Sequence, residues 1–197
     1  LGAGHGAHPE LRLTFEKDLA VLPTFAQVAG QGISSGPRRT DAGLDLPGID
    51  VDLHKLLHAG QTVTVHRPLP SSARATVTTR VSEVYDKGKA AVIVMESQAV
   101  SLEGGDPLWT STSQVWARGE GGFGGPAGPD SGPTAPDRSP DVVVDTPTWP
   151  GQARLYRLNG DLNPLHADPE FAALAGLPAP IMHGLASYGI VAKAVVD

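Results

Sequence analysis

Residues 156–169 read YRLNGDLNPLHADP, and a little further along the chain residues 180–184 read PIMHG. The first stretch places a carboxylate, an amide and an imidazole in the spacing D-x-N-x-x-H, at Asp161, Asn163 and His166. Asn163 precedes a proline, which is a turn signal, so the chain can bend there and bring Asp161 back toward His166. A carboxylate and an imidazole that share one water form a general acid and base pair. The chemistry of this protein is therefore expected in this bend.

Two helices are predicted after the bend. Asp168 followed by Pro169 has the form of an N-cap with proline at the first helical position, and Gly176 is a natural stop. These signals predict a short helix from about Pro169 to Ala175. Apolar residues at helical spacing predict a second, central and buried helix that begins between 181 and 184. Its predicted apolar stripe consists of Ile181, Leu185, Tyr188, Ala192 and Val195.

Gly184 lies in the first turn of the second predicted helix. Backbone N–H groups in a first turn have no partner within the helix, and the helix dipole is positive there, so an oxyanion could be held. Gly184 has no side chain that would block a carbonyl oxygen. Gly189, one turn later, would let another backbone pack closely against the helix.

Composition excludes several classes of function. The chain has 197 residues, a hydrophobic content of 40% and a formal net charge of −6 with a pI of about 5.6. The negative charge argues against a general nucleic-acid binder and against a basic membrane-binding surface. The absence of cysteine excludes disulfides, thiolate nucleophiles and cysteine metal sites. No apolar run predicts a membrane span and no leader is recognised, so a cytoplasmic protein with a small-molecule or protein partner is expected.

The first half of the chain is predicted to form an antiparallel sheet. Leu11, Leu13 and Phe15 alternate with polar residues as in a half-buried strand, and a helix is possible from 25 to 29 after Pro23. Residues 30–47 are rich in Gly, Ser and Pro and predict a loop. Further strands are predicted around Val63 and Val65 and over 75–84, 91–100 and 108–116, with turns at 86–89 and 104–107.

Residues 119–140 hold seven glycines and five prolines, which is too little apolar content for packing and predicts a linker. The glycines at 121–125 do not predict a phosphate-binding loop, because no strand, lysine and helix frame them. A second unit is predicted to begin at Val142.

Motifs along nearly the whole chain carry a resemblance to a known family. They are R-L-x-G-D-x-N-P-L-H at 157–166 and P-I-M-H-G-L at 180–185, with VLPTF at 21–25, LH at 57–58, RPLP at 67–70, DKG at 86–88 and GGFGG at 121–125. Together they resemble the MaoC-like dehydratases, specifically the hydratase 2 type of enoyl-CoA hydratase. Agreement at so many points is more specific than any one motif.

The resemblance implies an α+β fold, the double hot-dog, in which two antiparallel sheets each wrap around one helix. It implies an N-terminal hot-dog unit over 1–118 that binds the acyl chain and CoA, a linker over 119–141, and a C-terminal catalytic hot-dog unit over 142–197. The second unit is expected to be incomplete, because this chain stops after the central helix where the family continues with strands. The family's opening is likewise expected to be missing before residue 1.

The activity that the resemblance implies is the reversible hydration of a trans-2-enoyl-CoA to a (3R)-3-hydroxyacyl-CoA. Asp161 and His166 would activate the water, Asn163 would orient it, and the N–H of Gly184 would stabilise charge on the thioester oxygen. The resemblance requires no metal or other cofactor. An acyl-CoA thioester is the expected partner, and a homodimer is implied by the family.

A further set of residues is expected to bind the substrate. His58, Ala59 and Lys87 match pieces of the family that help to bind the acyl-CoA. The chain departs from the family at Ala59, where Gly is usual, and at Gly60, where Glu is usual. The other expected substrate contacts lie between the catalytic positions and are Leu162, Pro164 and Leu165.

The candidate residues also have structural interpretations. An aspartate such as Asp161 commonly serves caps and turns, Asn163 can simply stabilise its turn, and a histidine such as His166 is often a hydrogen-bonded structural residue. His183 could be considered as a metal ligand with His166 and Asp168. The spacing is a weak metal signal, so His183 is interpreted as structural.

Two rival functions remain open. A hot-dog acyl-CoA thioesterase would bind the same thioesters but would release a free thiol. A non-catalytic acyl-CoA-binding module would bind without turnover.

Overall fold

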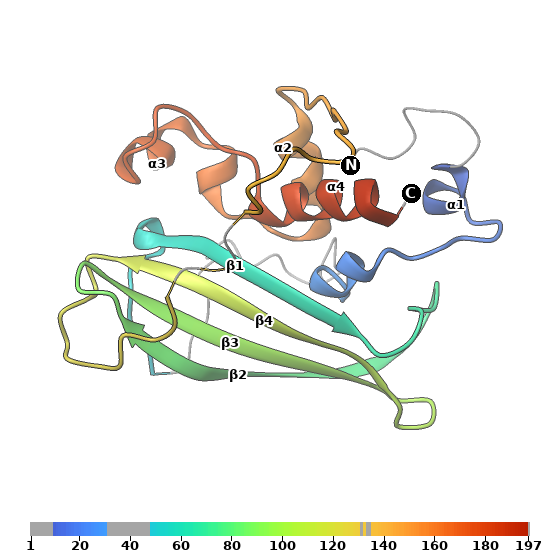
Figure 1. Ribbon diagram of the computed structural model, residues 1–197, viewed down its shortest axis with the longest axis horizontal. Helices are drawn as coiled ribbons and strands as arrows, with labels where there is room; N and C mark the ends of the chain where they lie inside the picture. The colour runs from blue at the N-terminus through green and yellow to red at the C-terminus, as the bar shows by residue number, and fades with distance from the viewer. Residues whose placement is uncertain (1–9, 31–47, 131, 133–134, 197) are drawn as a thin grey trace.

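A computed structural model describes residues 10–30, 48–130, 132 and 135–196. Its main element is a four-stranded antiparallel sheet with the strand order β1-β4-β3-β2. Helices from the second half of the chain lie over one face of this sheet (Figure 1). The strands are β1 (Leu56–Val65), β2 (Ala75–Asp86), β3 (Ala90–Ser101) and β4 (Pro107–Arg118).

The predicted hairpins are confirmed. Turns at 87–89 and 102–106 join β2 to β3 and β3 to β4. Gly88 has a φ of 74° and Gly104 a φ of 106°, in the left-handed region that favours glycine. The strand β1 pairs with β4, so the first strand closes back onto the last one. The prediction of a loop at 30–47 falls almost entirely outside the described residues.

The two faces of the sheet differ because side chains alternate along each strand. One buried cluster is centred on Ile93 and Val115, and a second on Ala99 and Trp109, which pack with Ala26 from the N-terminal segment. The opposite face carries cross-strand rows of polar residues, such as Thr62, Thr112, Glu96 and Arg80 in register.

The N-terminal segment folds differently from the prediction at one point. The residues expected to form a strand form α1 (Leu11–Thr14), with Phe15 as its C-cap. Phe15 N–H donates to the carbonyl of Leu11 at 2.8 Å, which closes a helical turn. Alternation over so few residues does not distinguish a strand from one helical turn, and both Leu11 and Phe15 are exposed. The helix after Pro23 is present as η2 (Pro23–Gln27), and η3 (Leu53–Lys55) precedes β1.

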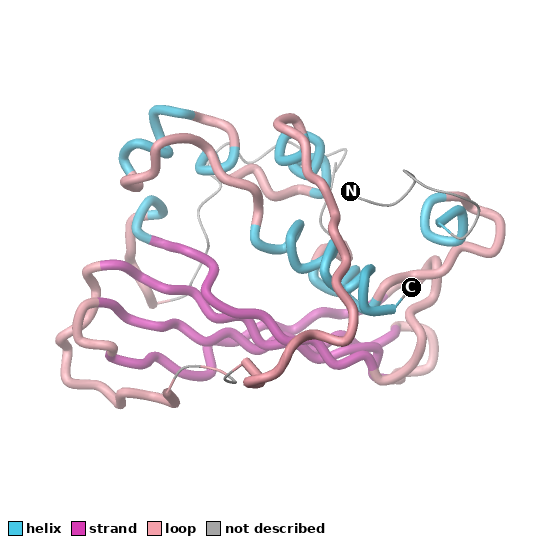
Figure 2. Tube along the Cα trace, turned by 45° about the horizontal axis from the view of Figure 1, so that its top comes forward, coloured by secondary structure: helices cyan, strands magenta, loops and turns pink. Residues whose placement is uncertain are grey.

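From Gln152 onward the elements in the described part of the chain are all helices. The short helix after Asp168 is confirmed as α3 (Pro169–Leu174), and Asp168 caps it by accepting from the N–H of Glu170. The second predicted helix is α4 (Gly184–Val196). The preceding elements are α2 (Gln152–Tyr156), η4 (Arg157–Asn159) and η5 (Pro164–His166). Figure 2 shows these helices as a layer above the sheet. None of the helices in the described part of the chain is long and apolar enough to cross a bilayer.

The prediction that the second helix is buried on an apolar stripe is wrong for this structure. Within α4 only Ala186 is buried, and Val195 is 80% exposed. Ile181 lies before the helix and is 39% exposed. The helix packs against η2, while Val191, Val195 and Val196 stay exposed.

The glycine-rich segment after β4 is fixed at its beginning by one carboxylate. Asp86 accepts hydrogen bonds from the N–H groups of Gly88, Gly122 and Gly124, at 2.7 to 2.8 Å. These bonds hold the pKa of Asp86 below its usual value, the bond from Gly122 being the largest cause. The amides of Gly122 and Gly124 in this segment therefore bind the side chain of Asp86, the last residue of β2.

Candidate active site

The bend around Asn163 is held by hydrogen bonds from its own side chains. Oδ1 of Asp161 accepts from the N–H of Asn163 at 3.1 Å, and Oδ1 of Asn163 accepts from the N–H of Leu165 at 3.0 Å. These are the local bonds by which Asp and Asn compete with regular helix. Arg157 Nη1 donates to the carbonyl of Asn163 at 2.8 Å and ties the bend to the preceding helical turn. The side chains of Asp161 and Asn163 thus stabilise the turn because each accepts a bond from the N–H group two residues later.

The bend is joined to the segment that leads into α4. Nδ1 of His166 donates to the carbonyl of Ile181 at 2.8 Å. The N–H of Ile181 contacts the carbonyl of Leu165 at 3.4 Å. Nε2 of His183 donates to the carbonyl of Asp161 at 3.3 Å. The two motifs that the sequence singles out therefore form one structural unit.

Three polar side chains converge at this junction. Asp161, His166 and His183 each offer one polar atom, and these atoms lie within 4.8 Å of one another. The rings of His166 and His183 are stacked, with centroids 3.8 Å apart and planes inclined by 27°. The ring of Tyr156 lies against His183 on a 4.6 Å centroid separation. The predicted approach of Asp161 to His166 is thus present in the structure.

The hydrogen bonds fix which nitrogen of His166 can act as a base. A carbonyl oxygen can only accept, so Nδ1 of His166 carries the proton that it donates to Ile181. In the neutral imidazole the lone pair then lies on Nε2. This tautomer gives the half-buried His166 a basic nitrogen that the backbone bond does not use.

Burial shifts two pKa values in the cluster. The pKa of His183 is lowered to about 4, mainly because the ring is buried and next because His166 lies beside it. The pKa of Tyr156 is raised to about 12, mainly by burial and further by the charge of Asp161. His183 and Tyr156 are therefore uncharged at neutral pH, so that Asp161 and His166 face uncharged neighbours.

Gly184 is the first residue of α4, where backbone N–H groups have no acceptor within the helix. A side chain added at Gly184 would meet His58 of β1, with Cβ of Gly184 3.7 Å from Cβ of His58. The start of α4 and the first strand of the sheet therefore approach each other next to the cluster. Nε2 of His58 donates to the carbonyl of Gly60 at 3.0 Å, which leaves Nδ1 without its proton in the neutral ring.

The other predicted substrate contacts lie in different surroundings. Ala59 is exposed at an irregularity of β1, where the pairing with β4 shifts register. Lys87 lies in the β2–β3 turn, and its Nζ donates to the carbonyl of Pro129 at 2.7 Å. Leu165 is only 4% exposed, so its side chain belongs to the interior. Leu162 and Pro164 are half-buried in the bend.

Sequence reasoning missed three contributors to this site. Tyr156, Arg157 and the carbonyl of Ile181 contact the cluster or fix its bend. The signal for Arg157 was its position at the start of the motif, one turn before the bend that it holds. Tyr156 and the Ile181 carbonyl give no such signal, because their contacts depend on how α4 returns to the bend.

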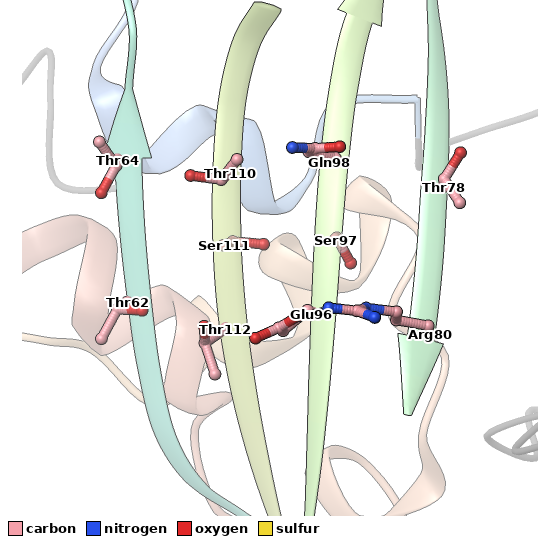
Figure 3. A pocket seen from close by; sticks show the side chains of 10 residues that line it. All are labelled: Thr62, Thr64, Thr78, Arg80, Glu96, Ser97, Gln98, Thr110, Ser111 and Thr112. Atoms are coloured by element: carbon pink, nitrogen blue, oxygen red, sulfur yellow. Dashed lines mark hydrogen bonds and ion pairs between the residues drawn. The ribbon is translucent and has the colours of Figure 1, made fainter. Parts of the chain in front are cut away.

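A separate hollow of about 390 Å³ lies on the polar face of the sheet, and Figure 3 shows the side chains that line it. Arg80 and Glu96 form an ion pair in it at 2.7 Å. None of the predicted site residues lines this hollow. Its other lining residues are Thr62, Thr64, Thr78, Ser97, Gln98, Thr110, Ser111 and Thr112.

One carboxylate and two imidazoles are also a possible donor set for a divalent cation. The sequence predicts that no metal or other cofactor is needed. That remains a prediction, and metal analysis of the purified protein would test it.

Comparisons with known proteins identify two domains in this chain. Residues 1–119 match the MFE-2 hydratase 2 N-terminal domain, and residues 132–197 match the MaoC-like domain. Enoyl-CoA hydratase ChsH3 of Mycobacterium tuberculosis is 49% identical over all of this chain. The peroxisomal enoyl-CoA hydratase 2 of Arabidopsis thaliana is 39% identical over 95% of it. The chain spans 68% and 63% of these two relatives, about two thirds of their length.

A solved structure agrees with these matches. The MaoC-like dehydratase from Phytophthora capsici has a TM-score of 0.78 and 31% identity, over 98% of this chain and 67% of that one. This similarity confirms the α+β hot-dog fold, with one four-stranded sheet and an incomplete second unit among the described residues. The chain therefore belongs to the MaoC-like dehydratases of the hydratase 2 type, a family of hydro-lyases.

Proposed function

We propose that the protein adds water reversibly to the double bond of a trans-2-enoyl-CoA and forms a (3R)-3-hydroxyacyl-CoA. The observation that carries this proposal is the meeting of Asp161 and His166 beside the first turn of α4. Relatives that are named enoyl-CoA hydratases support the substrate class.

In this mechanism a water molecule lies between the carboxylate of Asp161 and Nε2 of His166. One of these groups takes a proton from the water as its oxygen bonds to C3 of the substrate, and a proton is delivered to C2. The sum of these steps is the addition of H and OH across the double bond. Oδ1 of Asn163 already accepts from the backbone, so the side-chain NH₂ group of Asn163 would orient the water.

Negative charge develops on the thioester oxygen as water attacks C3. The N–H of Gly184 at the start of α4 would donate to that oxygen, and the helix dipole would favour its charge. The approach of His58 to Gly184 places the sheet next to this position, which supports a role of His58 in substrate binding. Ala59, Lys87, Leu162, Pro164 and Leu165 remain predicted substrate contacts.

The central test uses crotonyl-CoA with the full-length protein. We expect the absorbance of the enoyl thioester to fall in the wild type, and Asp161→Asn or His166→Ala to abolish this change while acyl-CoA binding is retained. Matched controls are Asp168→Asn, which keeps a capping side chain, and His66→Ala at an exposed position. Full activity of either site variant would contradict the assignment.

The same assay separates the rival functions. A thioesterase would release free CoA thiol, which a thiol-reactive dye detects, and a binding module would hold crotonyl-CoA without turnover. A stereospecific 3-hydroxyacyl-CoA dehydrogenase identifies the configuration of the hydroxyl product.

The compartment and the oligomeric state are further proposals. The sequence favours a cytoplasmic protein, whereas the Arabidopsis relative is named peroxisomal, and the family resemblance implies a homodimer. Cell fractionation and light scattering of the full-length protein test these two points.

A further inference from the structure

His183 is the most buried of the three clustered side chains, with 1% of its surface exposed. The proposed mechanism assigns it no role, and the sequence alone indicates a structural residue. Its carbonyl accepts from the N–H groups of Ala186 and Ser187, at 3.1 and 3.3 Å, so its backbone is part of the first turn of α4. The ring of His183 is thus attached to the longest helix among the described residues.

Two contacts connect this ring to both residues of the proposed acid and base pair. Its face stacks on the ring of His166 at 3.8 Å, and its Nε2 donates to the backbone carbonyl of Asp161 at 3.3 Å. Tyr156 packs against the ring at 4.6 Å and closes it off. The ring of His183 therefore lies against His166 and the main chain of Asp161 at the same time.

A ring in this place cannot readily move protons to a substrate. It is almost fully buried, and its one hydrogen-bonded nitrogen is used by a backbone carbonyl. The other nitrogen, Nδ1, has no hydrogen-bond partner among the described residues. Burial also keeps the ring uncharged at neutral pH, so it does not repel a protonated His166.

We propose that His183 is a positioning residue, which holds the imidazole of His166 and the main chain of Asp161 in the relative geometry that hydration requires. This inference rests on the proposed function. It concerns the turnover of bound substrate, because His183 contacts the ring of His166 and the backbone carbonyl of Asp161 and is shielded from solvent.

The stack and the hydrogen bond can be removed separately. His183→Phe keeps an aromatic ring against His166 but loses the donor to Asp161. His183→Gln keeps a donor of similar reach but loses the ring, and His183→Ala loses both. Misplacement of catalytic groups by about 1 Å can cost about 100-fold in rate. We expect kcat for crotonyl-CoA to fall by about 100-fold in His183→Ala and by less in the other two, with KM within about twofold.

A second measurement does not depend on turnover. In ¹⁵N-histidine NMR spectra the wild-type His166 should show a single neutral tautomer with the proton on Nδ1, as its bond to Ile181 requires. In His183→Ala and His183→Gln we expect this tautomer to become mixed. His66→Ala serves as the control, because His66 is an exposed histidine outside the cluster.

The outcomes separate the two proposals. A folded His183→Ala or His183→Gln variant with unchanged kcat, or with an unchanged His166 tautomer, would overturn the positioning role. A higher KM at unchanged kcat would also overturn it, since it would indicate contact with the substrate. If the wild type fails to hydrate crotonyl-CoA while the His166 tautomer depends on His183, the proposed function fails and the positioning of His166 stands.

Discussion

At the scale of single residues, the proposed oxyanion site depends on the absence of a side chain at Gly184. Gly184 begins α4, and in the proposed mechanism its N–H donates to the thioester oxygen, which a side chain at this position would obstruct. An added Cβ would lie 3.7 Å from the nearest atom of His58, which is an ordinary contact. The fold can therefore accept alanine at this position. If the variant is as stable as the wild type, any loss of activity is an effect on catalysis.

We predict that Gly184→Ala keeps the unfolding midpoint of the wild type but lowers kcat for crotonyl-CoA by about 10-fold or more, since the methyl group would displace the oxygen from its N–H donor. Thermal unfolding and steady-state hydration measure the two effects. Unchanged kcat would show that the thioester oxygen is held elsewhere.

His183 should also make stability depend on pH. Its pKa is lowered in the folded state to about 4 from 6.5, so the unfolded chain binds the proton more readily. The stability that this pKa difference contributes is complete above pH 6.5, and it is lost as the pH falls toward the pKa of His183 in the folded state. We predict that the free energy of unfolding decreases between pH 7.5 and 5.5, by at most about 1.4 kcal/mol for each pH unit below 6.5.

Urea unfolding of the wild type and of His183→Phe at several pH values measures this contribution. The variant cannot titrate at this position, so its stability should change less over the same range. His66→Phe, at an exposed position, should retain the wild-type dependence. Equal slopes for the wild type and His183→Phe would show that the buried ring is already charged or free to titrate.

At the scale of elements, α4 is the clearest difference between expectation and structure. Gly189 was expected to admit a closely packed backbone, yet a Cβ built there meets no described atom within 4 Å. Because glycine in a helix interior costs about 0.5 to 1 kcal/mol relative to alanine, Gly189→Ala should stabilise this structure by about that amount. Chemical unfolding of the chain over residues 1–197 measures the gain.

The same substitution in a longer form of the protein is informative. A loss of stability there would mean that another segment packs closely on Gly189. Gly128→Ala is a control that should lower stability, because its Cβ would clash with the ring of Tyr85.

The elements that the sequence predicted well are those with local causes. The cap of α3 depends on Asp168 and Pro169, which are neighbours, and the bend depends on side chains that bond within two residues. The strands follow from runs of ten or more residues that are either apolar or rich in alternating β-branched residues, with turn signals between them. By contrast, the residues around Leu11 predict a strand but form a helical turn, because their pattern is too short to distinguish the two. The order of strands in the sheet is not predicted, because it depends on pairing between residues far apart in the sequence.

At the scale of the whole molecule, the candidate site is formed by the meeting of two layers. The sequence placed Asp161, His166 and Gly184 in one unit and His58 in the other, but it could not show that His58 reaches Gly184. That contact depends on how α4 lies over β1, which no local pattern encodes. The family resemblance is the source of the proposed roles, and the structure shows that β1 and the start of α4 approach each other.

One hydrogen bond joins these two layers near the site. Nη1 of Arg118, the last residue of β4, donates to the carbonyl of Ala175 at the end of α3, at 2.9 Å. A bond from a charged donor contributes about 1 kcal/mol or more when it is partly buried. We predict that Arg118→Ala lowers the unfolding midpoint by about 2 to 4 °C. It should also raise KM for crotonyl-CoA. His58 lies in the sheet layer and Gly184 in the helix layer, so a looser link between the layers would disturb the proposed substrate site.

The matched control is Arg67→Ala, which removes an exposed ion pair of 2.8 Å to Asp106 within the sheet unit. Exposed pairs contribute little, so this variant should keep both the unfolding midpoint and KM. Arg118→Lys, which retains the charge but has a shorter reach and a single ammonium donor, should fall between the wild type and Arg118→Ala. If Arg118→Ala and Arg67→Ala behave alike, the layers are held by apolar packing, and the approach of His58 to Gly184 does not depend on the link at Ala175.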